Sequence, residues 1–316
     1  MPDLSLSEPC DEIDIEDTGE DELDPVELNL QKRNVHSDSS DLEILTDSKR
    51  NISPTSPYFS KEDFLSLSYF PGCSHQQEER RLESHRNLKN KLAKIDHAIW
   101  PRLSYYGKKF GRVRKKREFL WWAYYPSPDM TKTMCLNFFL GKHGLHALAN
   151  AELTKPFTRV LKNIRDRSDE FDELMQSLQL DENFYALIYT RLPLLPENND
   201  NFYIKKQFRI PKADITADAI ISAIEFIEEN FDTIIKEMLS DVESSPYYDG
   251  KKDTQYFRKT FCGPNAKVKQ PLSSCIIRFN YLFPKDEIVA LPFEQLTQDI
   301  LDVEHELRKV IEFANV

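Results

Sequence analysis

The chain has 316 residues and a formal net charge of −11, with 53 acidic and 42 basic residues. The negative charge belongs to one end: the first fifty residues carry sixteen Asp and Glu against four Lys and Arg, which leaves 37 acidic and 38 basic residues after Arg50. The acidic balance therefore does not exclude a nucleic-acid or phosphate partner for the remainder. Only eight residues are glycine, and none are spaced as in a Walker A loop or a dinucleotide-binding fingerprint, which argues against a phosphate-cradling loop.

Neither a membrane span nor a secretion signal is indicated. No run of about 18 apolar residues is present, and the amino terminus is acidic where a signal peptide would be basic and then apolar. The cysteines are widely spaced and form no Cys-x-x-Cys pair, so reduced thiols are expected. We therefore expect a soluble intracellular protein, cytoplasmic or, in a eukaryote, nuclear, with no cofactor, no metal and no membrane partner.

Residues 1–57 are expected to form a disordered acidic tail. All 36 aromatic residues follow this segment, beginning at Tyr58, so the tail cannot bury enough apolar surface to offset its chain entropy. Its simplest role is that of a solubilising extension. Short apolar islands, such as residues 42–45, suggest the alternative that part of it orders on a partner.

The next two parts of the chain are predicted to be a helical segment over residues 58–100 and a larger domain over residues 101–316. Leucines and isoleucines between Glu78 and Ile99 follow one helical face. Two strands are predicted, over residues 119–125 and 134–140. The first is apolar on both faces and is joined to the second by a Pro-rich turn. A strand-to-helix turn is expected at Gly141 and Gly144.

Three later helices show apolar residues at alternating spacings of three and four, over residues 157–178, 220–238 and 293–310. Three further strands are expected at 184–192, 202–210 and 274–283. Because strands and helices do not alternate strictly, we predict an α+β fold with a mainly antiparallel sheet of about five strands and helices packed on it.

A similar strand-Pro-Lys-helix order occurs twice, at 202–239 and 274–314. Pro211-Lys212 and Pro284-Lys285 stand at equivalent places between a strand and a helix. This order suggests an internal duplication. The alternative is that proline simply ends a strand and begins a helix in both places.

The densest charge in the predicted domain is a basic segment over residues 108–117, preceded by two tyrosines. Basic residues beside aromatic rings are suited to neutralising phosphates and stacking on bases. Two alternatives are a solvated lead-in to the following strand and a basic localisation signal. The candidate binding residues here are Tyr105, Tyr106, Lys108, Lys109, Arg112, Arg114, Lys115, Lys116 and Arg117.

A second basic and aromatic stretch lies at residues 247–259, within a long predicted loop of the kind that is usually functional or disordered. It adds the candidate binding residues Tyr247, Tyr248, Lys251, Lys252, Arg258 and Lys259. Asp249 and Lys251 also have the Asp-x-Lys spacing of metal-dependent nucleases, but the acids upstream fall in or just after a predicted helix. They are weak catalytic candidates. His143 and His146 could share a metal, yet no third ligand is signalled nearby.

Two functional hypotheses follow. The first is a non-enzymatic interaction protein that uses an acidic flexible arm and a basic-aromatic docking surface to bind a protein partner. The alternative is a nucleic-acid-binding or nucleic-acid-processing protein in which the acidic tail is an internal competitor for the basic surface. A metal-dependent nuclease or hydrolase is a weak third hypothesis. The oligomeric state is not indicated.

Overall fold

The computed structural model describes residues 56–67, 74–111, 119–129, 132–151, 154–191, 205–244 and 275–316. The chain separates into two units, 1–31 and 32–316, and every described residue belongs to the second. The predicted acidic tail therefore lies almost wholly outside the described residues. Within the described part, no helix is both long and apolar enough to span a membrane.

In the described part of the chain, seven strands form one antiparallel sheet in the order β1-β2-β3-β4-β7-β5-β6. Their bounds are β1 Gly107–Phe110, β2 Phe119–Tyr125, β3 Cys135–Gly141, β4 Gly144–Ala151, β5 Phe184–Arg191, β6 Lys205–Pro211 and β7 Cys275–Pro284. The α+β class is confirmed, but the expected count of about five strands was too low. β1 was missed because it lies inside the basic segment. β4 was missed because it is rich in alanine, a weak strand former.

The turn at Gly141 and Gly144 joins two strands and not a strand and a helix, which corrects the expectation from the sequence. Gly141 pairs with Gly144 at the end of the β3–β4 hairpin. Gly144 has a φ of +141°, and a Cβ atom there would lie 2.1 Å from the backbone oxygen of Phe283 in the neighbouring β7. Gly144 is thus required both by its backbone conformation and by the close approach of β7.

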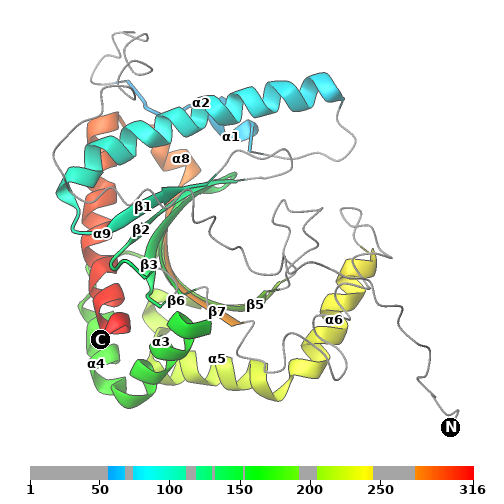
Figure 1. Ribbon diagram of the computed structural model, residues 1–316, viewed down its shortest axis with the longest axis vertical. Helices are drawn as coiled ribbons and strands as arrows, with labels where there is room; N and C mark the ends of the chain where they lie inside the picture. Colours follow the sequence, from blue (N-terminus) through cyan, green and yellow to red (C-terminus); the bar gives the residue numbers. More distant parts are fainter. Residues whose placement is uncertain are drawn as a thin grey trace, which may run out of the picture. The chain divides into compact units, whose positions relative to one another are not determined.

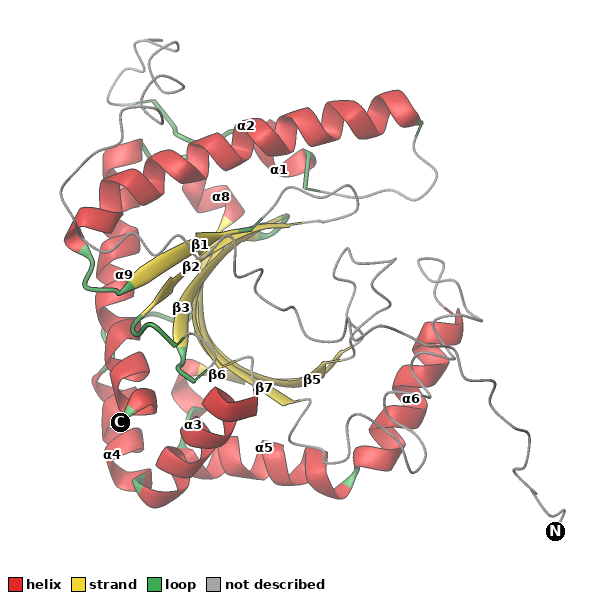
Figure 2. Cartoon of the chain, in the orientation of Figure 1, coloured by secondary structure: helices red, strands yellow, loops and turns green. Residues whose placement is uncertain are grey.

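Helices flank the sheet (Figure 1, Figure 2). Their bounds are α1 Lys61–Leu65, α2 His75–Ile99, α3 Thr154–Asp166, α4 Ser168–Ser177, α5 Ala217–Glu229, α6 Phe231–Ser244, α8 Lys285–Ile288 and α9 Phe293–Asn315, with short 3₁₀ turns at Trp100–Arg102 and Lys212–Asp214. The first two expected long helices are each divided, at Arg167 and at Asn230. The third, α9, is continuous.

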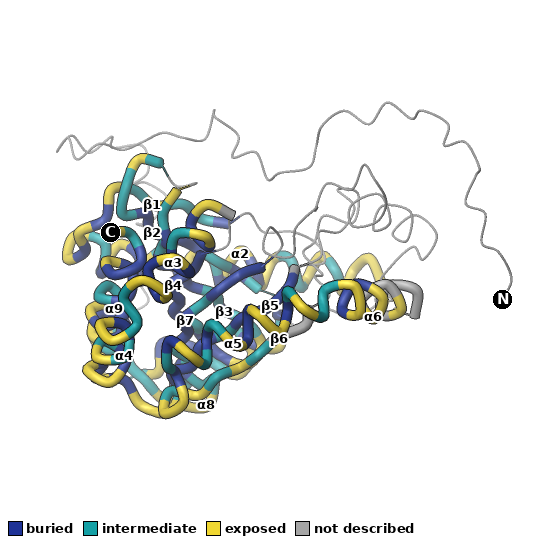
Figure 3. The backbone as a smooth tube through the Cα atoms, turned by 90° about the horizontal axis from the view of Figure 1, so that it is seen from below, coloured by how far each residue is buried: buried dark blue, intermediate teal, exposed yellow. Residues whose placement is uncertain are grey.

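The outer face of the curved sheet packs on α2, α3, α4, α5 and α9, which lie along its outer side (Figure 1). Phe279 of β7 lies 5.9 Å from Phe171 of α4, and Phe171 lies 5.6 Å from Phe313 of α9, measured between ring centroids. Figure 3 shows buried residues along the strands and exposed residues along the surfaces of α4 and α6. Burial of this face supplies most of the hydrophobic stabilisation.

β6 and β7 each end at a proline and are each followed by a short helical turn that begins at a lysine, and then by a long helix. This local order matches the repeat seen in the sequence. The two strands differ in position, because β7 is central in the sheet and β6 is at its edge. An internal duplication of 202–239 and 274–314 stays a prediction.

Gly144→Ala should lower the free energy of unfolding by more than about 2 kcal/mol, because the new Cβ meets the β7 backbone at a φ that alanine rarely adopts. Gly141→Ala is the matched control. A Cβ at Gly141 meets no atom within 4 Å, so its cost should stay below about 1 kcal/mol. Urea unfolding of both variants measures the difference, and equal costs would contradict the assigned turn.

Candidate binding site on the inner face of the sheet

The inner face of the sheet is the face opposite these outer helices. Strand pairing places its residues in rows across the strands. One row runs Asn150, Arg278, Leu187 and Arg209 across β4, β7, β5 and β6. The adjacent rows contain Asn137, Leu148, Asn280 and Tyr185, then Phe139, His146 and Leu282, and on the other side Ile276 and Tyr189.

The strands differ from the rest of the chain in charge, since none of the described strands contains Asp or Glu. They nevertheless contain the cationic residues Lys108, Lys109, Arg191, Lys205, Lys206, Arg209 and Arg278. In a chain with a net charge of −11, this is a marked segregation of charge. The sheet is therefore a cationic element inside an acidic protein, and an anion that approaches it meets attraction.

Arg278 is at the centre of the inner face. Its Nε donates a hydrogen bond to Asn150 Oδ1 at 2.9 Å, which fixes the plane of the guanidinium. The guanidinium carbon lies 5.2 Å from the ring centroid of Phe139 and 5.2 Å from that of Tyr189. Arg278 is half-buried while Asn150 is fully buried, so the guanidinium is held in place by contacts on several sides.

Arg209 is the exposed cation of the same row. Its guanidinium carbon lies 3.9 Å from the ring centroid of Tyr185, a stacking distance. No carboxylate of the described residues lies within ion-pair distance of it. Burial raises the pKa of Tyr185, and the positive charges of Arg209 and Arg278 act in the opposite direction. The tyrosine therefore stays a neutral ring under the cation.

His146 and Asn280 form a polar pair beside Arg278. His146 Nδ1 lies 3.2 Å from Asn280 Oδ1. Burial lowers the pKa of His146 to about 4, so the ring is neutral near pH 7. Because an amide oxygen can only accept, Nδ1 carries the proton and donates to it. Asn280 is 0% exposed, and its Nδ2 has no hydrogen-bond partner among the described residues.

The candidate binding residues that were predicted from the sequence, where the structure describes them, lie on different faces of the sheet. Tyr105 is buried on the outer side near Glu304, and burial and that carboxylate raise its pKa. Lys108 Nζ lies 2.6 Å from Asp96 Oδ2 and 4.9 Å from the Trp100 ring centroid, on the outer face. Tyr106 is 38% exposed, and Lys109 lies on the inner face of β1.

The other candidates lie outside the described residues: Arg112, Arg114, Lys115, Lys116, Arg117, Tyr247, Tyr248, Asp249, Lys251, Lys252, Arg258 and Lys259. The basic-aromatic docking surface expected from the sequence therefore stays a prediction. Of the histidine pair, His143 lies in the β3–β4 turn and His146 on the inner face. Among the described residues, no group of three or more His, Cys, Asp and Glu is arranged to hold a metal.

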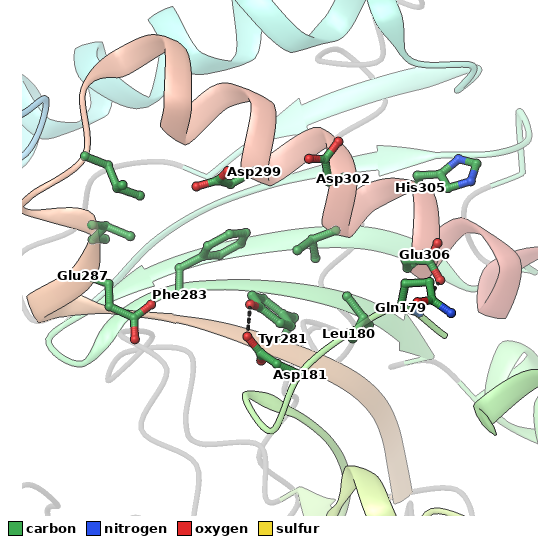
Figure 4. A pocket seen from close by; sticks show the side chains of 13 residues that line it. Gln179, Leu180, Asp181, Tyr281, Phe283, Glu287, Asp299, Asp302, His305 and Glu306 are labelled. Atoms are coloured by element: carbon green, nitrogen blue, oxygen red, sulfur yellow. Dashed lines mark hydrogen bonds between the residues drawn. The ribbon is translucent and has the colours of Figure 1, made fainter. Parts of the chain in front are cut away.

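A cavity of about 450 Å³ lies on the other side of the sheet, between β7, α8 and α9 (Figure 4). Acidic side chains line much of it, including Asp181, Glu287, Asp299, Asp302 and Glu306. Tyr281 donates a hydrogen bond to Asp181 Oδ2 at 3.0 Å, and burial and this carboxylate raise its pKa. This lining would repel an anion, so the inner face is the better anion site.

Protonation of His146 should have its midpoint near pH 4, because its burial disfavours the imidazolium and lowers its pKa to about 4. The unfolded state, with an ordinary histidine pKa near 6.5, binds the proton first. His146 should therefore contribute stability above pH 6.5 and lose that contribution as the pH falls toward 4. NMR titration of the His146 ring measures this directly. A midpoint near 6.5 would contradict the neutral His146–Asn280 pair.

No model of a known protein family matches the chain, and no curated protein sequence is similar to it. The inner face combines stacked guanidinium groups, aromatic rings and paired amide and imidazole groups, without a carboxylate in any described strand.

Proposed function

We propose that the chain is a non-enzymatic binding protein that holds single-stranded nucleic acid on the inner face of its sheet. One observation carries the proposal: Arg209 and Arg278 lie within cation–π distance of aromatic rings, on a face whose described strands contain no Asp or Glu. Guanidinium groups neutralise phosphates, and aromatic rings stack on bases. Guanidinium groups and aromatic rings are both present on the inner face, in the row that contains Arg278 and Arg209 and in the rows next to it.

The spacing of the two arginines suits a chain of phosphates. They stand in one row with β5 between them, so their backbones are two strand spacings apart, roughly 10 Å. Single-stranded binding sites combine a cationic track with stacking rings in this way. A ligand that lay across the strands from β7 to β6 would contact Arg278 on β7 and then Arg209 on β6, the strand at the edge of the sheet.

A protein partner is the competing hypothesis from the sequence. An acidic protein surface would be attracted by the same cations, but it would make little use of the partly exposed Phe139 ring as a stacking surface. This ring therefore favours nucleic acid. The proposal includes no catalytic step, and the weak nuclease candidates Asp249 and Lys251 lie outside the described residues.

The acidic amino-terminal segment is proposed to compete with nucleic acid for this cationic surface. Sixteen acidic residues among the first fifty are enough to oppose every cation of the described strands. Such a competitor would weaken binding most at low salt, where electrostatic attraction is least screened. It would also favour selective release of weakly bound, non-specific ligands.

Arg209→Gln in the full chain should weaken binding of a short single-stranded oligonucleotide about threefold to tenfold at low salt, and should lower the salt dependence by about one phosphate contact. Fluorescence anisotropy at two salt concentrations measures both. Arg165→Gln is the matched control, because Arg165 is an exposed arginine of α3, a helix that packs on the outer face. Equal losses in the two variants would mean that only net charge matters.

Deletion of residues 1–56 should tighten oligonucleotide binding severalfold at low salt and have less effect at high salt. The same anisotropy titrations test this. Unchanged affinity at both salt concentrations would exclude the segment as a competitor without affecting the inner-face site.

A further inference from the structure

We propose that the cavity between β7, α8 and α9 is a docking site for arginine side chains of a basic segment in a protein partner (Figure 4). The cavity lies on the outer side of the sheet, away from the inner face that is proposed to hold nucleic acid, so the two sites are independent. Three features point to this ligand: an apolar floor that solvent can reach, two aromatic rings, and carboxylates that have no cationic partner among the described residues.

The cavity is accessible at its rim and apolar at its floor. Its volume is about 450 Å³, within the range of roughly 300–1,000 Å³ that is typical of ligand sites. Asp181, Glu287 and Asp302 are exposed, whereas the lining residues Phe283 and Val303 are buried. A side chain that enters from solvent therefore passes carboxylates before it reaches apolar surface.

The charge of the lining selects for a cation. Five of the described lining residues are acidic, and none of them is Lys or Arg. Of these five, only Glu306 has a cationic partner in the part of the chain that the structure describes, Lys309, whose Nζ lies 2.6 Å from Glu306 Oε1. Asp299 and Asp302 each accept a hydrogen bond from a glutamine amide of α9, which carries no charge. The remaining negative charge attracts a cation from solution.

Two aromatic rings of β7 provide a surface for a flat cation. The ring centroids of Tyr281 and Phe283 lie 4.9 Å apart at an interplanar angle of 71°, so the two rings form a corner. Figure 4 shows the Phe283 ring between the carboxylates of α9 on one side and Asp181 on the other. A cation in the cavity would therefore lie beside aromatic rings and between carboxylates, and both kinds of group attract it.

This arrangement suits arginine better than lysine. A guanidinium group is planar and has five N–H donors, so its face can pack on a ring while its edges bond to carboxylates on more than one side. The apolar stem of arginine can lie along the apolar floor. A lysine ammonium is a compact, strongly hydrated charge that has no flat face to pack on a ring.

The acidic surface continues beyond the cavity, which indicates a peptide segment and not a single small cation. Glu182 follows Asp181 in the sequence, and Asp286 precedes Glu287. Glu182 and Asp286 are exposed, and neither forms an ion pair with another described residue. An arginine in the cavity would thus have carboxylates on both sides for further cations of the same segment.

The test measures binding of a short labelled peptide, in which arginine alternates with glycine, to the full chain by fluorescence anisotropy. Asp299→Asn combined with Asp302→Asn removes two charges from the cavity and keeps side-chain oxygens that accept from the glutamines, so the fold should be retained. This double variant should weaken binding about fivefold or more. Glu287→Gln on α8 should weaken it about twofold to threefold and gives an independent second variant.

Glu225→Gln combined with Glu229→Gln is the matched control. Both residues are exposed on α5 and lie outside the cavity lining, and the change in net charge is the same. The control should keep the affinity within about twofold, because distant exposed charges are screened. Equal losses in the two double variants would mean that only net charge matters and would overturn the site.

Two further probes test the class of ligand. The same peptide with lysine in place of arginine should bind about threefold or more weakly, and free spermidine should compete poorly at equal charge. Equal affinity for the lysine peptide would overturn the assignment to arginine, and efficient competition by spermidine would overturn the assignment to a peptide. Binding of the single-stranded oligonucleotide should be unchanged in the Asp299→Asn, Asp302→Asn variant, so failure of this site and failure of the proposed function are distinguishable.

Discussion

The pairing of β7 with both β4 and β5 is the constraint on which the rest of the structure depends. β7 joins the β1–β4 meander to the β5–β6 hairpin, so residues from near the end of the chain close the sheet. Its alternating side chains have two separate tasks. Ile277 and Phe279 are buried with the helices on the outer side, while Arg278 and Asn280 lie on the inner face. A shift of one residue in this register would exchange the two sets and destroy both the core and the candidate site.

Acidic residues are distributed unequally between the sheet and the helices. The described strands contain no acidic residue, whereas α9 alone carries Asp299, Asp302, Glu304 and Glu306. Glu304 and Glu306 are buried, and each is paired with a cation of the same helix, Arg308 and Lys309. The acidic groups of α9 thus serve the outer layer. The net charge of the chain says little about the inner face, where the arginines and aromatic rings lie together.

Much of the fold could be predicted from the sequence, because its signals are local. The three-and-four spacing of apolar residues indicated α9, and short segments rich in apolar and aromatic residues indicated β2, β3, β5, β6 and β7. β4 has weak local propensity and exists because β3 and β7 pair with it on either side. The breaks at Arg167 and Asn230 within two predicted helices are tertiary effects that periodicity cannot show.

The candidate site was harder to predict, because it depends on long-range register. Arg278, Asn280, His146 and Tyr185 come from three strands. They lie up to 134 residues apart in the sequence, the separation between His146 and Asn280, with Tyr185 and Arg278 between them. The dense basic segment at 108–117 is the stronger local signal, yet its Lys108 is paired with Asp96 on the outer face. One signal was available: Arg278 and Asn280 are polar residues at alternate positions of an otherwise apolar strand, a pattern that marks the second face of a sheet.

Photo-crosslinking of a short single-stranded oligonucleotide to the full chain, followed by mass spectrometry of the crosslinked peptides, tests most directly whether the inner face is the binding surface. Aromatic side chains that stack on bases should crosslink, so the crosslinks should fall in residues 135–151, 184–191 and 275–284, and first of all at the partly exposed Phe139. Crosslinks confined to residues outside these three strand segments would contradict the assignment of the site to the sheet.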